Sequence, residues 1–273
     1  KELAFVEDRA ILKVLNLASK QTRTLLTDRE LAPSADGSQY YQWSPDGRWI
    51  LFDYSVPGFA PGEVGIVKAD GSAKAVNLTE SGFNDSQAKW ILGGQAMLWF
   101  SNRDGMKAAA WSGGSQNDVY ALFFTRDAWD RFRLTKEEAA LLKEIEEKKE
   151  KAKSEAAKDK KEPADKEKKE EIKPLAIDWG GLPLRKARLT IHSSSLGDAL
   201  VNKDGDTLFY LSRFEKGMNL WTTNLKSRET KMLATLNANG GRLAWDKEQK
   251  SIFLLADGTL SKIDPSSGKR DPA

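Results

Sequence analysis

The stretch that decides the fold of this 273-residue chain is residues 40–55, YYQWSPDGRWILFDYS. Its centre, SPDG, is a tight-turn sequence: Pro45 presets φ, Asp46 can bond the backbone ahead of it, and Gly47 takes the positive φ that other residues resist. The run 49–52 that follows is apolar at every position, which is typical of a strand covered on both faces. The stretch therefore predicts a strand, a tight turn and a fully buried second strand.

The same pattern occurs three more times. The later units are QAKWILGGQAMLWFSNRDG (87–105), GDALVNKDGDTLFYLSRFEKG (197–217) and GRLAWDKEQKSIFLLADG (241–258). Superposing the four units aligns Gly47, Gly94, Gly205 and Gln249, at spacings of 47, 111 and 44 residues. Removing an insertion of about 64 residues from the middle interval restores one period, and a period of 40–50 residues with four strands is typical of a β-propeller blade. We predict an all-β propeller of four-stranded antiparallel blades, with about five blades represented.

The pattern divides the chain into three parts. Residues 1–135 and 175–273 carry the blades, and residues 136–174 form a charged insertion. Before the first full unit, strands are expected only over 3–7, 11–17 and 22–26. The final unit offers strands over 252–255 and 260–263. We therefore expect the first and last blades to be incomplete and the sequence to be a portion of a longer chain.

The insertion is a balanced mixture of charges. Residues 136–173 hold 13 basic and 13 acidic side chains in 38 positions. Thr135, followed by acidic residues in the first turn, predicts a helix cap, with a helix from Leu134 to about Glu155. Beyond Ala156 no apolar residue recurs at helical spacing until Ile172, so that part is expected to be solvated and mobile. A linker or solvated helix is the favoured interpretation, and a partner-binding helix is the alternative.

The composition excludes several kinds of chemistry. The chain has no cysteine and one histidine, which rules out disulfides, thiolate catalysis and multi-histidine metal sites within these residues. The net charge of +3 is nearly balanced and gives no electrostatic footprint for nucleic acid. No apolar run approaches the roughly 20 residues of a membrane helix. We expect no cofactor, no metal, no nucleic acid and no membrane span.

One cluster invites a catalytic interpretation. His192 stands beside Ser193, Ser194 and Ser195, with Asp198 close behind. A hydrolytic triad needs its three members to converge in space, and neighbours along one loop rarely do so. The histidine is better explained as a residue at a blade junction, and no catalytic residue is assigned.

Other motifs are weighed in the same way. The Asp-Gly pairs at 70–71, 104–105, 204–205 and 257–258 are isolated turns rather than calcium loops, which need several oxygen ligands at short spacing. The Gly/Ser-rich loop 111–115 lacks the context of a phosphate cradle, and a substrate-facing loop at the propeller mouth is its functional alternative. Of the nine tryptophans, those sharing a repeat column or lying in a strand are expected to pack in the core; these are Trp43, Trp90, Trp99, Trp221 and Trp245.

Beyond the repeat, three stretches resemble a known family. Residues 77–90, 101–138 and 188–226 are similar to the propeller region of bacterial homologues of tricorn protease, including the segment GGSQNDVYALFFT followed by a Lys/Glu-rich insertion. In that family TolB-like propeller repeats precede a PDZ domain and a tail-specific-type serine peptidase domain. These two domains have no counterpart in the residues given, so the resemblance carries over no catalytic residue.

The resemblance implies a function for the segment. It would be a non-catalytic propeller of a serine peptidase, acting as a scaffold and as an access or filter region for peptides or unfolded protein, with the PDZ and peptidase domains of the same chain as further partners. Export to the periplasm follows from the same resemblance, with a cytoplasmic site and a homo-oligomer left open. Two alternatives are a TolB-like propeller that binds protein or peptide without any peptidase, and the propeller of a prolyl-oligopeptidase-type enzyme.

Overall fold

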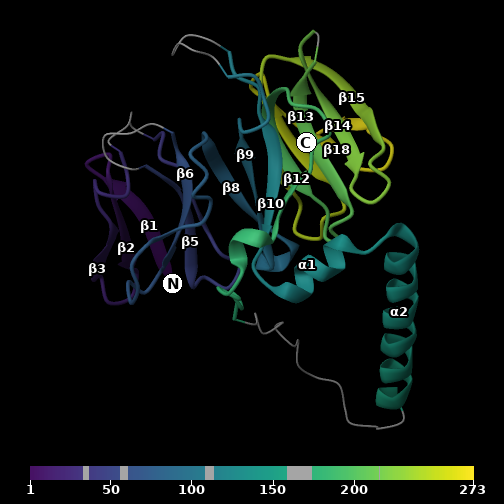
Figure 1. The fold of residues 1–273 in the computed structure, drawn as a ribbon, viewed down its shortest axis with the longest axis horizontal. Helices are drawn as coiled ribbons and strands as arrows, with labels where there is room; N and C mark the ends of the chain where they lie inside the picture. Colours follow the sequence, from purple (N-terminus) through teal and green to yellow (C-terminus); the bar gives the residue numbers. More distant parts are fainter. Residues whose placement is uncertain (33–36, 56–60, 108–113, 159–173, 215) are drawn as a thin grey trace.

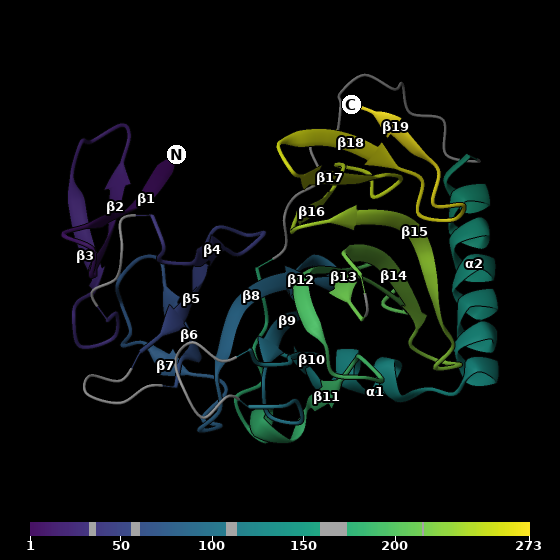
Figure 2. The ribbon, with the colours of Figure 1, turned by 90° about the horizontal axis from the view of Figure 1, so that it is seen from above.

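The chain forms five antiparallel sheets that follow one another along an arc (Figures 1 and 2). The computed structural model describes residues 1–32, 37–55, 61–107, 114–158, 174–214 and 216–273. In every sheet of the described chain, strands consecutive in sequence pair as neighbours. This is the all-β, bladed architecture that the repeat predicts, so the predicted fold class is confirmed.

The strands have the following bounds. The first sheet contains β1 (Glu2–Glu7), β2 (Ile11–Asn16) and β3 (Thr22–Leu26). The second contains β4 (Tyr41–Trp43), β5 (Trp49–Tyr54), β6 (Glu63–Lys68) and β7 (Val76–Asn77). The third contains β8 (Asp85–Ile91), β9 (Ala96–Ser101), β10 (Asp118–Phe123) and β11 (Lys186–Arg188), with one-turn helices η1 (Leu92–Gly94) and η2 (Leu182–Leu184) beside them. The fourth contains β12 (Ser195–Val201), β13 (Thr207–Arg213), β14 (Met218–Asn224) and β15 (Thr230–Ala238), and the fifth β16 (Arg242–Trp245), β17 (Ile252–Ala256), β18 (Thr259–Ile263) and β19 (Arg270–Pro272).

The SPDG turn forms as its sequence predicts. Ser44 Oγ accepts hydrogen bonds from the backbone N–H groups of Arg48 and Trp49 and donates to the Asp46 carboxylate. Gly47 has φ of +69°, the left-handed conformation that glycine adopts without a steric penalty. The turn thereby directs β5 back into the sheet, where Ile50, Leu51 and Phe52 are fully buried.

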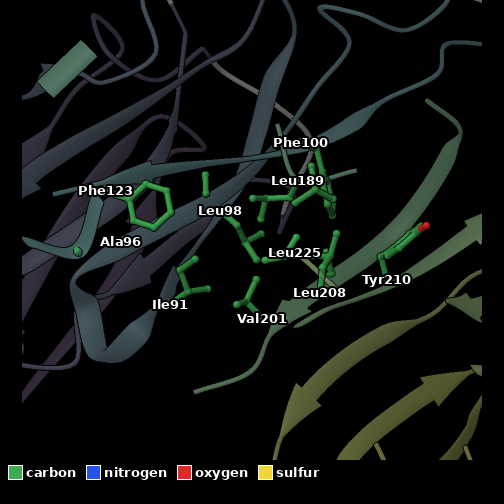
Figure 3. Close-up of a cluster of buried hydrophobic side chains, with 14 residues drawn as sticks. Ile91, Ala96, Leu98, Phe100, Phe123, Leu189, Val201, Leu208, Tyr210 and Leu225 are labelled. Atoms are coloured by element: carbon green, nitrogen blue, oxygen red, sulfur yellow. The ribbon is translucent and has the colours of Figure 1, made fainter. Parts of the chain in front are cut away.

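Apolar side chains fill the space between neighbouring sheets. Figure 3 shows the largest such cluster, in which β8–β10 of the third sheet face β12 and β13 of the fourth. Its members have almost no exposed surface because each strand is covered on both faces, which explains the unbroken apolar runs of the sequence. The labelled side chains are Ile91, Ala96, Leu98, Phe100, Phe123, Leu189, Val201, Leu208, Tyr210 and Leu225.

Two helices interrupt the third sheet between β10 and β11. The sequence analysis does not anticipate α1 (Arg126–Arg133), which begins at the capping hydroxyl of Thr125. The expected helix in the insertion is α2 (Lys136–Lys158), and Thr135 and Glu138 cap it reciprocally: each backbone N–H donates to the side chain of the other. Residues 159–173, for which the sequence predicts a solvated and mobile segment, lie outside the described residues.

The first and last sheets differ. Among the described residues, the first sheet has only β1, β2 and β3. The last sheet has a fourth strand, β19, where the sequence pattern predicts none. The pattern misses β19 because its three exposed residues carry no apolar signal; backbone pairing with β18 and a turn in which Asp264 accepts the N–H groups of Ser266 and Ser267 hold it in place.

Candidate binding surface on the inner strands

The first strand of each four-stranded sheet lies on the concave side of the arc (Figure 2). These inner strands are β4, β8, β12 and β16. Both β8 and β12 contain a β-bulge, between Ser86 and Lys89 and between Leu196 and Ala199. Because a bulge re-aims side chains and frees a backbone N–H from the ladder, it leaves polar groups pointing out of the sheet. The inner strands therefore offer a shared polar surface drawn from several sheets.

The first half of this surface centres on Gln87 in the bulge of β8. Its backbone N–H donates to Asp53 Oδ1 at 2.8 Å, which joins the second and third sheets. Its side-chain oxygen accepts from Arg242 Nη1 at 3.0 Å, although Arg242 belongs to the fifth sheet. Gln87 has φ of +55°, a conformation that non-glycine residues adopt only when the surroundings hold it. One residue thus links sheets that are far apart in sequence.

The second half centres on Asp198, whose side chain is only 1% exposed. Its carboxylate pairs with Lys89 Nζ of the third sheet and accepts the backbone N–H of Leu243 in the fifth at 2.7 Å. It also accepts the N–H of Ala199 at 2.8 Å. A buried carboxylate with three donors is well satisfied, so Asp198 ties three successive sheets together at the inner surface.

Burial shifts the titration of two groups on this surface. Desolvation raises the pKa of Asp53 to about 7, against a smaller lowering by the hydrogen bond from Gln87. Desolvation also raises the pKa of the Tyr40 hydroxyl, and the negative charges of Asp198 and Asp53 add to the effect. Asp53 therefore changes its charge near neutral pH, while Tyr40 stays a neutral hydrogen-bonding group.

The serine and histidine cluster singled out in the sequence does not form a triad. His192 is exposed and, within the described ranges, makes no side-chain hydrogen bond. Ser193 donates to Asp118, a carboxylate with no exposed surface that also accepts from Thr190 and pairs with Arg188. This buried network fastens the loop between β11 and β12 to β10, which is a structural role at the junction of two blades.

The next serine, Ser194, has a similar structural role. Ser194 is buried, and its hydroxyl accepts from Ser212 at 2.7 Å. Its backbone pairs with Asn117 in an isolated bridge that joins the third sheet to the fourth. The segment thus contributes hydrogen bonds between sheets.

Three of the four Asp-Gly pairs form tight turns. Asp70 accepts the N–H of Ser72, and Gly71, Gly205 and Gly258 all have positive φ, as tight turns require. Among the described residues, no group of three or more His, Cys, Asp or Glu side chains could hold a metal ion. Of the loop 111–115, only Gly114 and Ser115 fall in the described part of the chain, and both are exposed.

Two tryptophans of the repeat column link neighbouring sheets. Trp90 Nε1 donates to the carbonyl of Gln42 at 3.2 Å, and Trp245 Nε1 donates to that of Val201 at 3.0 Å. Each ring therefore joins an inner strand to the inner strand of the preceding sheet. Trp99 is buried in the third sheet and stacks on Tyr120, with ring centroids 5.5 Å apart. Outside the repeat column, Trp179 has an exposed side chain, with 43% of its surface accessible.

Sequence reasoning missed most of the inner surface. It named Asp198 only as a partner of His192, and it did not single out Asp53, Gln87, Lys89 or Arg242. The available signal was the occurrence of polar residues within otherwise apolar repeat units, as in FDYS and GDAL. That signal becomes informative only when the sheets are placed around a common axis.

Comparison with known proteins supports the fold and limits what else can be said. No protein-family model and no curated protein matches the chain. Among solved structures, tricorn protease matches with a TM-score of 0.62 and 10% identity, covering 97% of this chain and 24% of tricorn protease. TolB from Acinetobacter baumannii matches with a TM-score of 0.56 and 13% identity over 99% of this chain and 50% of TolB. A putative TolB from Agrobacterium tumefaciens gives 0.57 and 12%, over 100% of this chain and 76% of that one.

The five sheets therefore define a β-propeller. More particularly, their arrangement is similar to the propellers of tricorn protease and TolB, as the sequence resemblance implies. At identities of 10–13% the likeness is one of fold. The chain spans about a quarter of tricorn protease and half of the A. baumannii TolB. In the described parts of the chain, no helix is long and apolar enough to cross a membrane.

Proposed function

We propose that this chain is the non-catalytic propeller segment of a tricorn-type serine peptidase, where it serves as a scaffold and as an access region for unfolded peptides. The observation that carries the proposal is the inner surface, where polar and charged groups of four successive sheets meet on the concave side of the arc. Of these groups, Arg242 is exposed and Gln87 is half-buried, so both can be reached by an extended chain. The fold match to tricorn protease over 97% of the chain supports the same assignment.

The proposed partners are peptides or unfolded proteins, together with PDZ and peptidase domains of the same polypeptide. Export to the periplasm is part of the proposal and rests on the family resemblance. The complete reading frame provides a direct check. A PDZ domain and a tail-specific-type peptidase domain encoded after these residues would support the proposal, and a frame without a peptidase would contradict it.

A binding experiment addresses the surface itself. Fluorescently labelled β-casein, which is unfolded, is titrated with the chain and followed by anisotropy, with a folded protein of similar size as the comparison. We expect binding of casein only, and a several-fold loss in Arg242→Glu, because that change reverses the charge of an exposed side chain on an inner strand and removes its bond to Gln87. Lys262→Glu is the matched control, since Lys262 is exposed in β18, away from the inner strands. Equal binding by both variants would contradict a role for the inner surface.

One second function is favoured by a specific observation. The chain covers 76% of the putative TolB from Agrobacterium tumefaciens, far more than its share of tricorn protease. A TolB-like propeller that holds a protein or peptide partner without any peptidase fits that coverage. Capture of a defined, folded partner by the chain, with no peptidase domain in the reading frame, would select this alternative.

A further inference from the structure

Tyr40 and Asp53 lie opposite each other at the inner edge of the second sheet. The N–H of Asp53 donates to the carbonyl of Tyr40 at 3.0 Å, which continues the ladder between β4 and β5 by one pair. Side chains directly opposite in an antiparallel ladder share one face of the sheet. That face is turned to the third sheet, because Asp53 Oδ1 accepts the N–H of Gln87 in the bulge of β8. On the β6 side, Asp53 lies opposite Val64, which is buried and uncharged.

Each of these two side chains has an oxygen that the fold leaves unused. Among the described residues, Asp53 Oδ2 has no hydrogen-bond partner, and neither has the Tyr40 hydroxyl. Both side chains are partly exposed, and neither oxygen is among the fully buried polar atoms without a partner. A carboxylate oxygen and a phenol oxygen are therefore held side by side where a ligand on the inner surface can reach them.

Asp53 also lacks a cation to balance its charge. The two nearest candidates on the inner strands are engaged elsewhere: Lys89 pairs with Asp198, and Arg242 donates to the side chain of Gln87. Burial raises the pKa of Asp53 to about 7, the N–H of Gln87 lowers it by less, and no charged side chain in the described parts of the chain contributes. Asp198, by contrast, combines an ion pair with two N–H donors.

The electrostatics at Tyr40 show which sign of charge the position favours. Burial has the largest effect on the pKa of its hydroxyl and raises it, and the negative charges of Asp198 and Asp53 each raise it further. Arg242 acts in the opposite direction with a smaller effect. The field that disfavours a phenolate favours a cation at the same place, so a positive group beside the hydroxyl is stabilised.

We propose that Asp53 and Tyr40 form a subsite for a primary ammonium group of the peptide ligand, supplied by a lysine side chain or by a free α-amino terminus. The ammonium donates to Asp53 Oδ2 and to the Tyr40 oxygen, and it balances the charge of the carboxylate. A compact ammonium suits a carboxylate with one free oxygen, whereas the planar guanidinium of arginine pairs best with two. The inference rests on the proposed function for the peptide ligand and assigns it a chemical preference.

Four short, unstructured peptides with an uncharged fluorophore provide the test. The first has one lysine and blocked termini, and the second is identical except that its lysine is Nε-acetylated. The third keeps the acetyl-lysine and has a free α-amino group, and the fourth has arginine in place of lysine and blocked termini. Binding is followed by anisotropy at neutral pH.

We expect the first or the third peptide, or both, to bind about tenfold more tightly than the second, which is the effect of one charged hydrogen bond. Whichever of the two gains affinity identifies the source of the ammonium. The arginine peptide should bind less tightly than the better ammonium peptide. Equal affinity of the first three peptides, or an arginine peptide that binds as tightly as the better ammonium peptide, would overturn the proposal.

Matched variants assign the preference to the site. Asp53→Asn removes the charge and keeps an oxygen for the N–H of Gln87, so the ammonium peptide should fall to the affinity of the acetylated one. Asp130→Asn makes the same change at an exposed residue of α1 and should leave the preference intact. Tyr40→Phe keeps the ring and should weaken ammonium binding about threefold, the effect of one weaker hydrogen bond. Unchanged binding in Asp53→Asn or in Tyr40→Phe would overturn the proposal.

The pH dependence gives a readout in the parent protein. Since an ammonium pairs with the ionised carboxylate, its peptide should bind more tightly as pH rises from about 5.5 to about 7.5, toward and past the pKa of Asp53, while the acetylated peptide changes little. In carbon NMR, the titration midpoint of the Asp53 carboxyl should move to lower pH when the ammonium peptide is bound. Affinity that falls with pH, or a midpoint that does not move, would overturn the proposal.

Two combinations of results separate this inference from the proposed function. Casein binding that is lost in Arg242→Glu, with no preference among the peptides, would refute the inference and leave the proposed function standing. An ammonium preference that is lost in Asp53→Asn, with casein binding unaffected by Arg242→Glu, would do the reverse.

Discussion

Two regions of the molecule join neighbouring sheets by different means. One is the apolar junction between the third and fourth sheets, and the other is the polar surface of the inner strands. At the junction, side chains such as Leu98 and Leu208 have no exposed surface and pack without direction. On the inner surface, single directional bonds such as that from Arg242 to Gln87 join sheets far apart in sequence. The junction therefore depends on buried apolar surface, whereas the inner surface depends on single polar contacts.

Truncating the junction should produce the largest effect. Leu208→Ala removes a fully buried side chain from the cluster in Figure 3, and the surrounding strands can close the cavity only in part. We expect the free energy of unfolding to fall by about 2–5 kcal/mol, measured by urea denaturation. Leu260→Ala is the matched control, since Leu260 is 48% exposed, and its cost should stay below about 0.5 kcal/mol. Similar losses in the two variants would mean that the junction is not the main source of stability.

Breaking the inner surface at Asp198 should cost less. Asp198→Ala leaves the N–H of Leu243 and the ammonium of Lys89 without their partner. We expect a loss of about 2 kcal/mol in unfolding free energy, with Asp198→Asn recovering part of it because the amide oxygen still accepts from Leu243. A stability of Asp198→Ala within about 0.5 kcal/mol of the parent would show that the tie between sheets is not energetically significant.

The difference between the two regions also explains how much the sequence could reveal. Continuous apolar runs such as 49–52, repeated with SPDG-like turns, predict buried strands and the blade order, because burial on both faces leaves a local mark. The strand β19 leaves none, since its exposed residues pair through the backbone alone. The helix α1 leaves only a weak mark for a related reason, because most of its eight residues are charged.

The inner surface could not be predicted by the same means. Gln87 and Arg242 are separated by 155 positions, and nothing in either segment indicates the other. The positive φ of Gln87 arises from a bulge that side-chain periodicity does not encode. His192, which the sequence assigns to a blade junction, has an exposed side chain in the structure.

A pH series should distinguish the polar surface from the apolar junction. The pKa of Asp53 is raised from 3.8 to about 7 by burial, so the folded protein holds this proton between about pH 4 and 7 while the unfolded chain has lost it. The unfolded state then binds fewer protons, and stability falls as pH rises through that window and levels off above it. Asp53→Asn removes the titration and keeps an oxygen to accept from Gln87.

The measurement is the urea midpoint of both proteins from pH 4 to 8. We expect the parent to lose stability relative to Asp53→Asn as pH rises toward 7, with the difference constant above that value. Leu208→Ala should show the same pH profile as the parent, displaced downward, because its junction contains no titrating group of this kind. Parallel profiles for the parent and Asp53→Asn would show that Asp53 titrates normally.

The smallest effect is expected in the insertion, which contributes to neither region. Thr135 and Glu138 cap the start of α2, and Leu141 and Ile145 on the same helix are exposed, so capping rather than packing stabilises its first turn. Thr135→Ala should weaken that turn by about 1 kcal/mol, seen as faster amide exchange at the start of α2. Thr135→Ser keeps the capping hydroxyl and should restore slow exchange. Because α2 projects from the sheets rather than filling a junction, the global urea midpoint should stay at the parent value; a matching fall in that midpoint would show that the helix is part of the cooperative unit formed by the blades (Figure 1).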